Sequence, residues 1–453
     1  FYNSFENQGY GPNIGENYPF VYNFSYGPKA PTGSGPQATD GVYPIGYNSP
    51  WAGCSSASPG GTYTLESGLA CIAFTPTQVN AEGLGLQGLQ FNYQTPSTLS
   101  TNFTVQYSLN RNLSATASYV FTQGAHLQNG IGTNNVSQIY SATHSTSDTI
   151  ASGLNEIPFP DFSQGMSYHA TVGNSDYNGL QTKLEWQNAH GLNFLIAYTF
   201  SKTDSDAGDL LNGGNTGSDR APDVPGLGPR FDWGLANFDI RQVMHISGGY
   251  QLPFGKGKDF LNNGSKVTDA VIGGWAINWI ATLQGGQPLN IGCVDGTAAG
   301  LGCNAIKVPG QSQKLGLHKD ANGVLNWFGN PGAFNQACEL GVSPPTPTNC
   351  INVTGKDALG DGPGQTVTPG FHRLDFSTFK AFQLNERFSL QFRAEFFNIL
   401  NHPNFNAPGF GGNGVVSIGG STNFTSTTFG EIGSTRDNPQ DPRQIQFALK
   451  LYY

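Results

Sequence analysis

The chain has 453 residues, a formal net charge of −9 and only 11% charged residues, against about 25% in ordinary soluble domains. The negative charge and the scattered Lys and Arg residues argue against a nucleic-acid partner. No apolar run reaches the 18 residues of a transmembrane helix, but a membrane β-strand needs only about 9–11 alternating residues. Because few stretches keep helical periodicity, the composition predicts an all-β fold and leaves a membrane β-barrel open.

Three hairpins are predicted first along the chain. In the first, Phe103, Val105 and Tyr107 alternate with polar residues, "NRN" turns the chain, and the alternation resumes from Ala115 to Phe121. The second pairs residues 180–187 with 192–200 about the turn "NAHG". The third pairs residues 241–252 with 273–284, and its connection, residues 253–272, is longer.

A fourth hairpin is predicted from residues 373–384 and 387–398, about a turn at Asn385 and Glu386. Its first strand is irregular, because Lys380 falls in the apolar register. We expect either a β-bulge near Thr378 or a Lys380 side chain that snorkels to an interface.

The last predicted strand is residues 443–453, "RQIQFALKLYY", in which apolar and polar residues alternate to the final position. With the four hairpins it gives nine strands, and "FYNSF" at residues 1–5 predicts a further stub. We expect one face of the last strands to contact lipid and the other to face an interior. The lipid-facing set is Phe388, Leu390, Phe392, Phe447, Leu449 and Leu451; the interior set is Gln391, Arg393, Glu395, Gln446 and Lys450.

The segments between the hairpins are long and rich in Gly, Pro and Asn: residues 6–98, 124–177, 203–237, 286–370 and 399–442. Short turns on one side and long loops on the other are typical of transmembrane barrels. A soluble β-sandwich or propeller would explain the alternation alone. Low charge and loop asymmetry favour an antiparallel transmembrane β-barrel with long extracellular loops.

The six cysteines fall into pairs that are close in sequence. Neighbouring-pair disulfides in exposed loops are the simplest interpretation and indicate an oxidising compartment. Zinc is the alternative, but no pair has C-x₂₋₄-C spacing. The expected pairs are Cys54 with Cys71, Cys293 with Cys303, and Cys338 with Cys350.

Other motifs carry little chemistry. Residues 83–88, "GLGLQG", match a dinucleotide-binding pattern without the strand and helix that it needs, and "GKGK" at 255–258 lacks the context of a phosphate loop. Asp204, Asp206 and Asp209 form a weak calcium candidate, with a solvated acidic loop as the simpler interpretation. For Arg393 and Glu395 an ion pair is favoured over ligand contact. The sequence predicts no catalytic residue and no cofactor.

Several stretches together resemble the C-terminal part of TonB-dependent outer-membrane receptors, especially the Oar-like group with a carboxypeptidase-regulatory-like domain. They are "FYNSFENQGYGPNIGENYPF", "YNGLQTKLEWQNAHGLNFLIAYTFSKTDSD", "FDIRQVMHISGGYQLPFGKGKDF", "RAEFFNILNHPNFNAPG" and "FGEIGSTRDNPQDPRQIQFALKLYY". The resemblance covers nearly the whole chain and is looser in the long loops.

This resemblance implies a bacterial outer-membrane barrel that takes up a ligand with energy from TonB. It implies that residues 1–453 are the C-terminal part of the barrel, without the plug and the N-terminal domains that contact TonB. Tyr453 stands where the family has a terminal aromatic residue, which implies an assembly signal for the barrel-assembly machinery. The other implied partners are outer-membrane lipid and an unknown ligand.

The expected function is therefore that of a receptor or transporter, and not of an enzyme. The alternative is a secreted β-rich binding or adhesion protein that recognises a glycan or a protein through its long loops. A hydrolase is disfavoured, because the sequence offers no nucleophile with a matching base.

Overall fold

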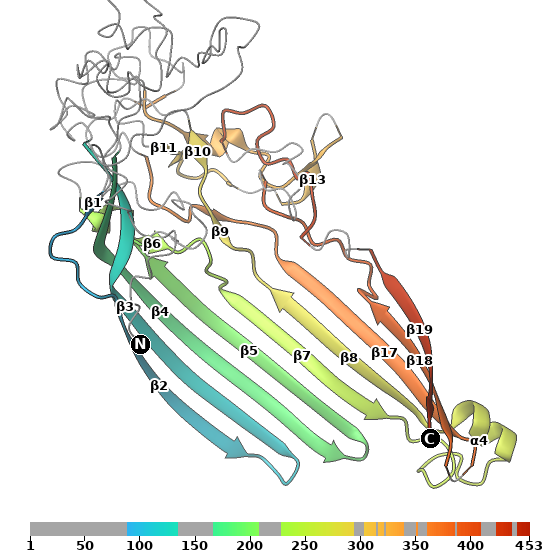
Figure 1. Cartoon of the computed structure of the whole chain (residues 1–453). Coiled ribbons are helices and arrows are strands. Elements are labelled where there is room, and N and C mark those ends of the chain that lie inside the picture. The colour runs from blue at the N-terminus through green and yellow to red at the C-terminus, as the bar shows by residue number, and fades with distance from the viewer. Residues whose placement is uncertain are drawn as a thin grey trace, which may run out of the picture.

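The structure is a computed structural model that describes residues 88–134, 166–207, 228–293, 303–313, 316–320, 323–338, 350–351, 360–385, 387–408, 423–436 and 442–453. The predicted stub at residues 1–5 and Cys54 and Cys71 lie outside this part of the chain. Within it the dominant element is one large, curved sheet of antiparallel strands, which all slant the same way in Figure 1.

Nine long strands form the sheet in the spatial order β19, β18, β17, β8, β7, β5, β4, β3, β2. The short β1 (Gly88–Leu89) pairs with β4, and β6 (Gly234–Leu235) pairs with β5. All four predicted hairpins and the terminal strand are confirmed. The long strands are β2 Ser97–Ser108, β3 Leu113–Thr133, β4 Met166–Ala189, β5 Leu192–Ser205, β7 Gln242–Gln251, β8 Trp275–Gln284, β17 Phe371–Gln383, β18 Ser389–Phe397 and β19 Gln444–Tyr452.

The register of these strands sorts the side chains into two faces. Cross-strand neighbours lie on the same face of a sheet, so a row of paired residues shows the character of that face. One row runs Phe194, Gly248, Trp279, Phe376, Phe396, Ile445, and the next runs Asn193, Gly249, Asn278, Ser377, Glu395, Gln446. We call the two sides of the sheet the apolar face and the polar face after these rows.

The apolar face is open. Side chains such as Phe103, Phe447 and Leu449 are 67–70% exposed, although each belongs to a regular row of the sheet. A contiguous apolar surface of this extent marks contact with a membrane or another protein.

The predicted bulge near Thr378 is wrong, because β17 pairs with β18 in continuous register from Phe376 to Gln383. The register shifts instead between Ala125 and Asn129 of β3. These shifts break the alternation, which is why the expected loop at residues 124–177 is too long at both ends: β3 continues to Thr133 and β4 begins at Met166.

Short connections close one end of the sheet. The Asn110 side chain accepts hydrogen bonds from the Asn112 and Leu113 N–H groups, and His190 and Gly191 form a two-residue turn with φ of 56° and 76°. The longest of these connections carries the helix α4 (Lys266–Ile272), which the alternation pattern did not indicate. No helix in the described residues has the length and apolarity needed to cross a membrane.

At the opposite end, the described parts of the long segments build a layer beyond the strand ends that lie away from α4 (Figure 1). Its core is a buried cluster that includes Ile291, Phe328 and Phe429, and the Phe328 and Phe429 rings stack with centroids 5.5 Å apart. Two 3₁₀ turns, η5 (Pro229–Asp232) and η6 (Pro331–Ala333), lie among these segments. Four small antiparallel pairs support the layer: β9 Pro288–Leu289 with β16 Thr366–Val367, β10 Gly292–Cys293 with β11 Cys303–Asn304, β12 Ile306–Lys307 with β15 Phe334–Asn335, and β13 His318–Lys319 with β14 Leu325–Asn326.

Candidate functional site

The polar face carries paired charges. On β4 the Lys183 ammonium lies 3.1 Å from the Glu185 carboxylate, and on β17 the Arg373 guanidinium lies 2.9 Å from Asp375. Each pair joins residues two apart on one strand, because such residues point to the same face. The His245 ring and the Thr282 hydroxyl, neighbours across β7 and β8, are 3.1 Å apart. This face can therefore bind a polar solute or hold water.

The predicted interior residues all lie on the polar face. Gln391 is opposite Lys450, Glu395 is opposite Gln446, and Arg393 lies between them on β18. Arg393 donates a hydrogen bond of 2.7 Å to Gln391 on the same strand. The ion pairs expected for Arg393 and Glu395 stay a prediction. That these residues line an interior stays a prediction.

Tyr453 follows β19 at the short-turn end of the sheet (Figure 1) and is 97% exposed. Its place at the end of the edge strand leaves the aromatic ring accessible. Its role as an assembly signal stays a prediction.

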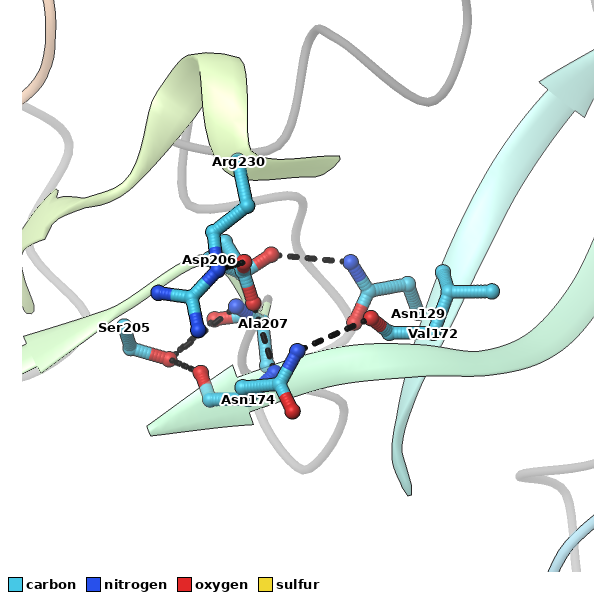
Figure 2. Close-up of polar contacts among 7 residues, drawn as sticks. All are labelled: Asn129, Val172, Asn174, Ser205, Asp206, Ala207 and Arg230. Atoms are coloured by element: carbon cyan, nitrogen blue, oxygen red, sulfur yellow. Dashed lines mark hydrogen bonds and ion pairs between the residues drawn. The ribbon is translucent and has the colours of Figure 1, made fainter. Parts of the chain in front are cut away.

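A second polar site lies where β3, β4 and β5 rise toward the long-loop layer. Figure 2 shows Asp206 between Arg230 and Asn174, with Asn129 on the β3 side. The Asn174 N–H donates to the Asp206 carboxylate at 2.6 Å, and the Asn129 amide donates to the Asp206 carbonyl at 2.9 Å. The Ser205 hydroxyl donates to the Asn174 carbonyl at 3.0 Å. We call Asn129, Asn174, Ser205, Asp206 and Arg230 the rim cluster.

Burial dominates the electrostatics of the rim cluster. Asp206 is fully buried, and this burial raises the pKa of its carboxyl, although the Asn174 N–H and the Arg230 charge act in the opposite direction. The Arg230 Nε atom is 4.0 Å from the carboxylate, and its guanidinium lies over the Trp233 ring. Nearby, burial also raises the pKa of Asp239, which accepts a 2.7 Å hydrogen bond from the Thr203 N–H.

The carboxylates of the calcium candidate have different partners in the structure. Asp204 forms an ion pair of 2.7 Å with Lys202, Asp206 belongs to the rim cluster, and Asp209 lies outside the described residues. In the part of the chain that the structure describes, no group of three or more His, Cys, Asp or Glu side chains could hold a metal ion. Calcium binding stays a prediction.

The cysteines in the long-loop layer are oxidised. Cys338 and Cys350 form a disulfide, as the sequence predicted. Cys293 is disulfide-bonded, and the residue opposite it across β10 and β11 is Cys303. These bonds stabilise a layer made of short strands.

Several residues of the rim cluster have no signal in the sequence pattern. Asn129 lies beyond the bulge that ends the alternation of β3, and Arg230 lies in the 3₁₀ turn η5. Of these residues, only Asp206 belongs to a motif that the sequence singles out, the acidic run at residues 204–209.

The two faces and the asymmetric connections define the wall of an outer-membrane type β-barrel, which has one apolar and one polar face. The chain belongs to the outer membrane beta barrel domain family, whose model matches residues 1–446. The protein is therefore an outer-membrane protein, and this level of the resemblance is confirmed.

Solved structures similar to this chain are also outer-membrane proteins. The outer membrane transporter YddB from Escherichia coli shares 9% identity over 82% of this chain and 35% of its own, with a TM-score of 0.36. The FrpB iron transporter from Neisseria meningitidis shares 10% identity over 82% of this chain and 33% of its own, with a TM-score of 0.33. BauA, the ferric preacinetobactin receptor from Acinetobacter baumannii, shares 8% identity over 79% of this chain and 30% of its own, with a TM-score of 0.35. This chain thus spans about a third of these proteins. Among curated proteins, none matches the sequence.

Proposed function

We propose that the chain is the barrel part of a TonB-dependent outer-membrane receptor of the Oar-like group, which takes up a ligand and is not an enzyme. The observation that carries the proposal is the two-faced sheet with a packed layer of loops at one end. The polar face offers a passage lined by paired charges such as Lys183 with Glu185, and the long-loop layer offers a surface that can select a ligand. The motifs shared with that family support the same function.

Uptake by whole cells tests the proposal. The source bacterium, a strain without this gene and a strain without tonB are given a defined mixture of ferric siderophores, cobalamin and oligosaccharides, and depletion of each solute is measured. We expect at least one solute to be depleted by the parent strain only. Depletion that persists without tonB would contradict energy coupling, and equal depletion by the parent and the gene deletion would overturn transport.

A point variant separates the passage from the rest of the barrel. Arg393→Gln removes a charge from the polar face, whereas Arg387→Gln makes the same change in the exposed β17–β18 turn. We expect only Arg393→Gln to reduce uptake when both variants are present in the membrane in equal amounts. A secreted adhesion protein, the alternative function, would instead remain in solution without detergent.

A further inference from the structure

The connection between β7 and β8, residues 252–274, is a folded unit and not an open loop. The Phe260 N–H donates to the Pro253 carbonyl and the Gly255 N–H to the Phe260 carbonyl, each at 2.9 Å. The Asp269 side chain, in α4, accepts a 2.7 Å hydrogen bond from the Lys256 N–H and so ties the loop to the helix. We call residues 252–274 the α4 unit.

The α4 unit packs against the apolar face. Lys380 and Trp275 are cross-strand neighbours on that face, and both reach the end of the helix. The Lys380 ammonium donates to the carbonyls of Asp269, at 3.1 Å, and of Gly273, while the Trp275 indole donates to the Val271 carbonyl at 2.9 Å. Because these donors extend from the apolar face, the end of α4 lies on the lipid side of the sheet, near its short-turn edge (Figure 1).

These contacts resolve two problems at once. An ammonium on the lipid side of a barrel is unfavourable, and the last carbonyls of a helix need donors. Lys380 is only 3% exposed, so its charge is covered by the helix that it caps. The predicted snorkelling of Lys380 is therefore replaced by a direct contact with helix carbonyls.

The outward side of α4 is apolar, and the loop before the helix carries basic residues. Val267 and Val271, four residues apart on one side of the helix, are 73% and 63% exposed. Phe260 is also exposed, and so are Lys256, Lys258 and Asp259 in the preceding loop, where the Lys258 ammonium lies 3.5 Å from the Gln251 side-chain oxygen. Apolar side chains beside lysines are typical of elements that lie in the interface of an anionic membrane.

We infer that the α4 unit is a lipid-binding anchor that takes an anionic phospholipid of the periplasm-facing leaflet. Short turns of outer-membrane barrels lie on the periplasmic side, and the apolar face beside α4 contacts lipid in this family. The acyl chain contacts Val267 and Val271, and the phosphate contacts Lys256 and Lys258. The anchor depends on the outer-membrane location and not on ligand uptake.

Fluorescence quenching in vesicles tests the anchor. In the full chain, Val271→Cys carries an NBD label, and the protein is placed in vesicles of phosphatidylcholine and phosphatidylglycerol. The quencher is a doxyl group near the headgroup of one lipid, either phosphatidylcholine or phosphatidylglycerol. Val324→Cys is the control, since Val324 is an exposed apolar residue of the long-loop layer. We expect quenching at position 271 only, and stronger quenching by phosphatidylglycerol. Equal, weak quenching at both positions would overturn the anchor, and so would a label that fluoresces as in water.

The lysines provide the second half of the test. Lys256→Gln combined with Lys258→Gln is expected to lower the phosphatidylglycerol enrichment around the label by about tenfold, because each basic residue at an anionic surface adds to the attraction. Enrichment that is unchanged in this variant would refute the headgroup contact. If Val271→Cys does not fold, Val267→Cys reports on the same surface.

Discussion

Leu449 lies near the middle of β19, opposite Phe392 on the apolar face, and its side chain is 68% exposed. Leu449→Arg therefore places a guanidinium where we expect the barrel to contact lipid. Gln446→Arg is the matched control, because residue 446 lies on the polar face of the same strand, opposite Glu395. The two variants carry the same charge and differ only in the face of the sheet that receives it.

The magnitude follows from the position in the bilayer. An arginine on the lipid face costs roughly 2–4 kcal/mol at the midplane and about 0–1 kcal/mol near the interfaces. Residue 449 is close to the centre of a strand of nine residues, so the larger cost applies. The folded to unfolded ratio should fall by roughly 30-fold to several hundred-fold. The control should change stability little, since its new charge lies beside the Glu395 carboxylate.

Reversible urea unfolding in lipid vesicles measures this difference, and the folded fraction is followed by the heat-dependent shift in gel mobility. The reasoning predicts a lower midpoint for Leu449→Arg alone, with an unchanged slope. Equal tolerance of arginine at both positions would show that the apolar face does not contact lipid. A larger loss for Gln446→Arg would show that the two faces are reversed.

Three further outcomes are expected. Because burial raises the pKa of Asp206, its carboxyl stabilises the fold fully below the unfolded pKa and this contribution is lost as the pH rises through the folded pKa. Asp206→Asn should therefore be neutral or stabilising at neutral pH, whereas Asp206→Ala leaves the Asn174 N–H without its acceptor and costs about 1–3 kcal/mol in urea unfolding. Tyr453→Ala should lower the amount of barrel in the outer membrane more than Tyr452→Ala, as measured by blotting of membrane fractions. Non-reducing peptide mapping should find only disulfides between cysteines that are neighbours in the sequence: Cys54 with Cys71, Cys293 with Cys303, and Cys338 with Cys350. Free thiols would contradict this prediction.

Much of the sheet could be predicted because alternation is a local property. Each strand shows its two faces in its own residues, as in "SLQFRAEFF" of β18, and short turns such as that at Asn110 fix which strands are paired. The prediction failed where the pattern was interrupted. The bulges after Ala125 move the side chains of β3 out of register, so the alternation pattern predicts a loop where the long-loop ends of β3 and β4 are paired.

The sequence by itself determined the nine strands, the pairing within the four hairpins and the alternation of each strand, since these depend on neighbours along the chain. Only the tertiary structure decided the partners of isolated polar groups. Lys380 caps a helix whose carbonyls are 107 and 111 residues away, and Asp206 is held by Asn174 and Arg230 from other segments. A buried charge or amide must find a partner in space, and the place of that partner is fixed by the packing of the whole sheet.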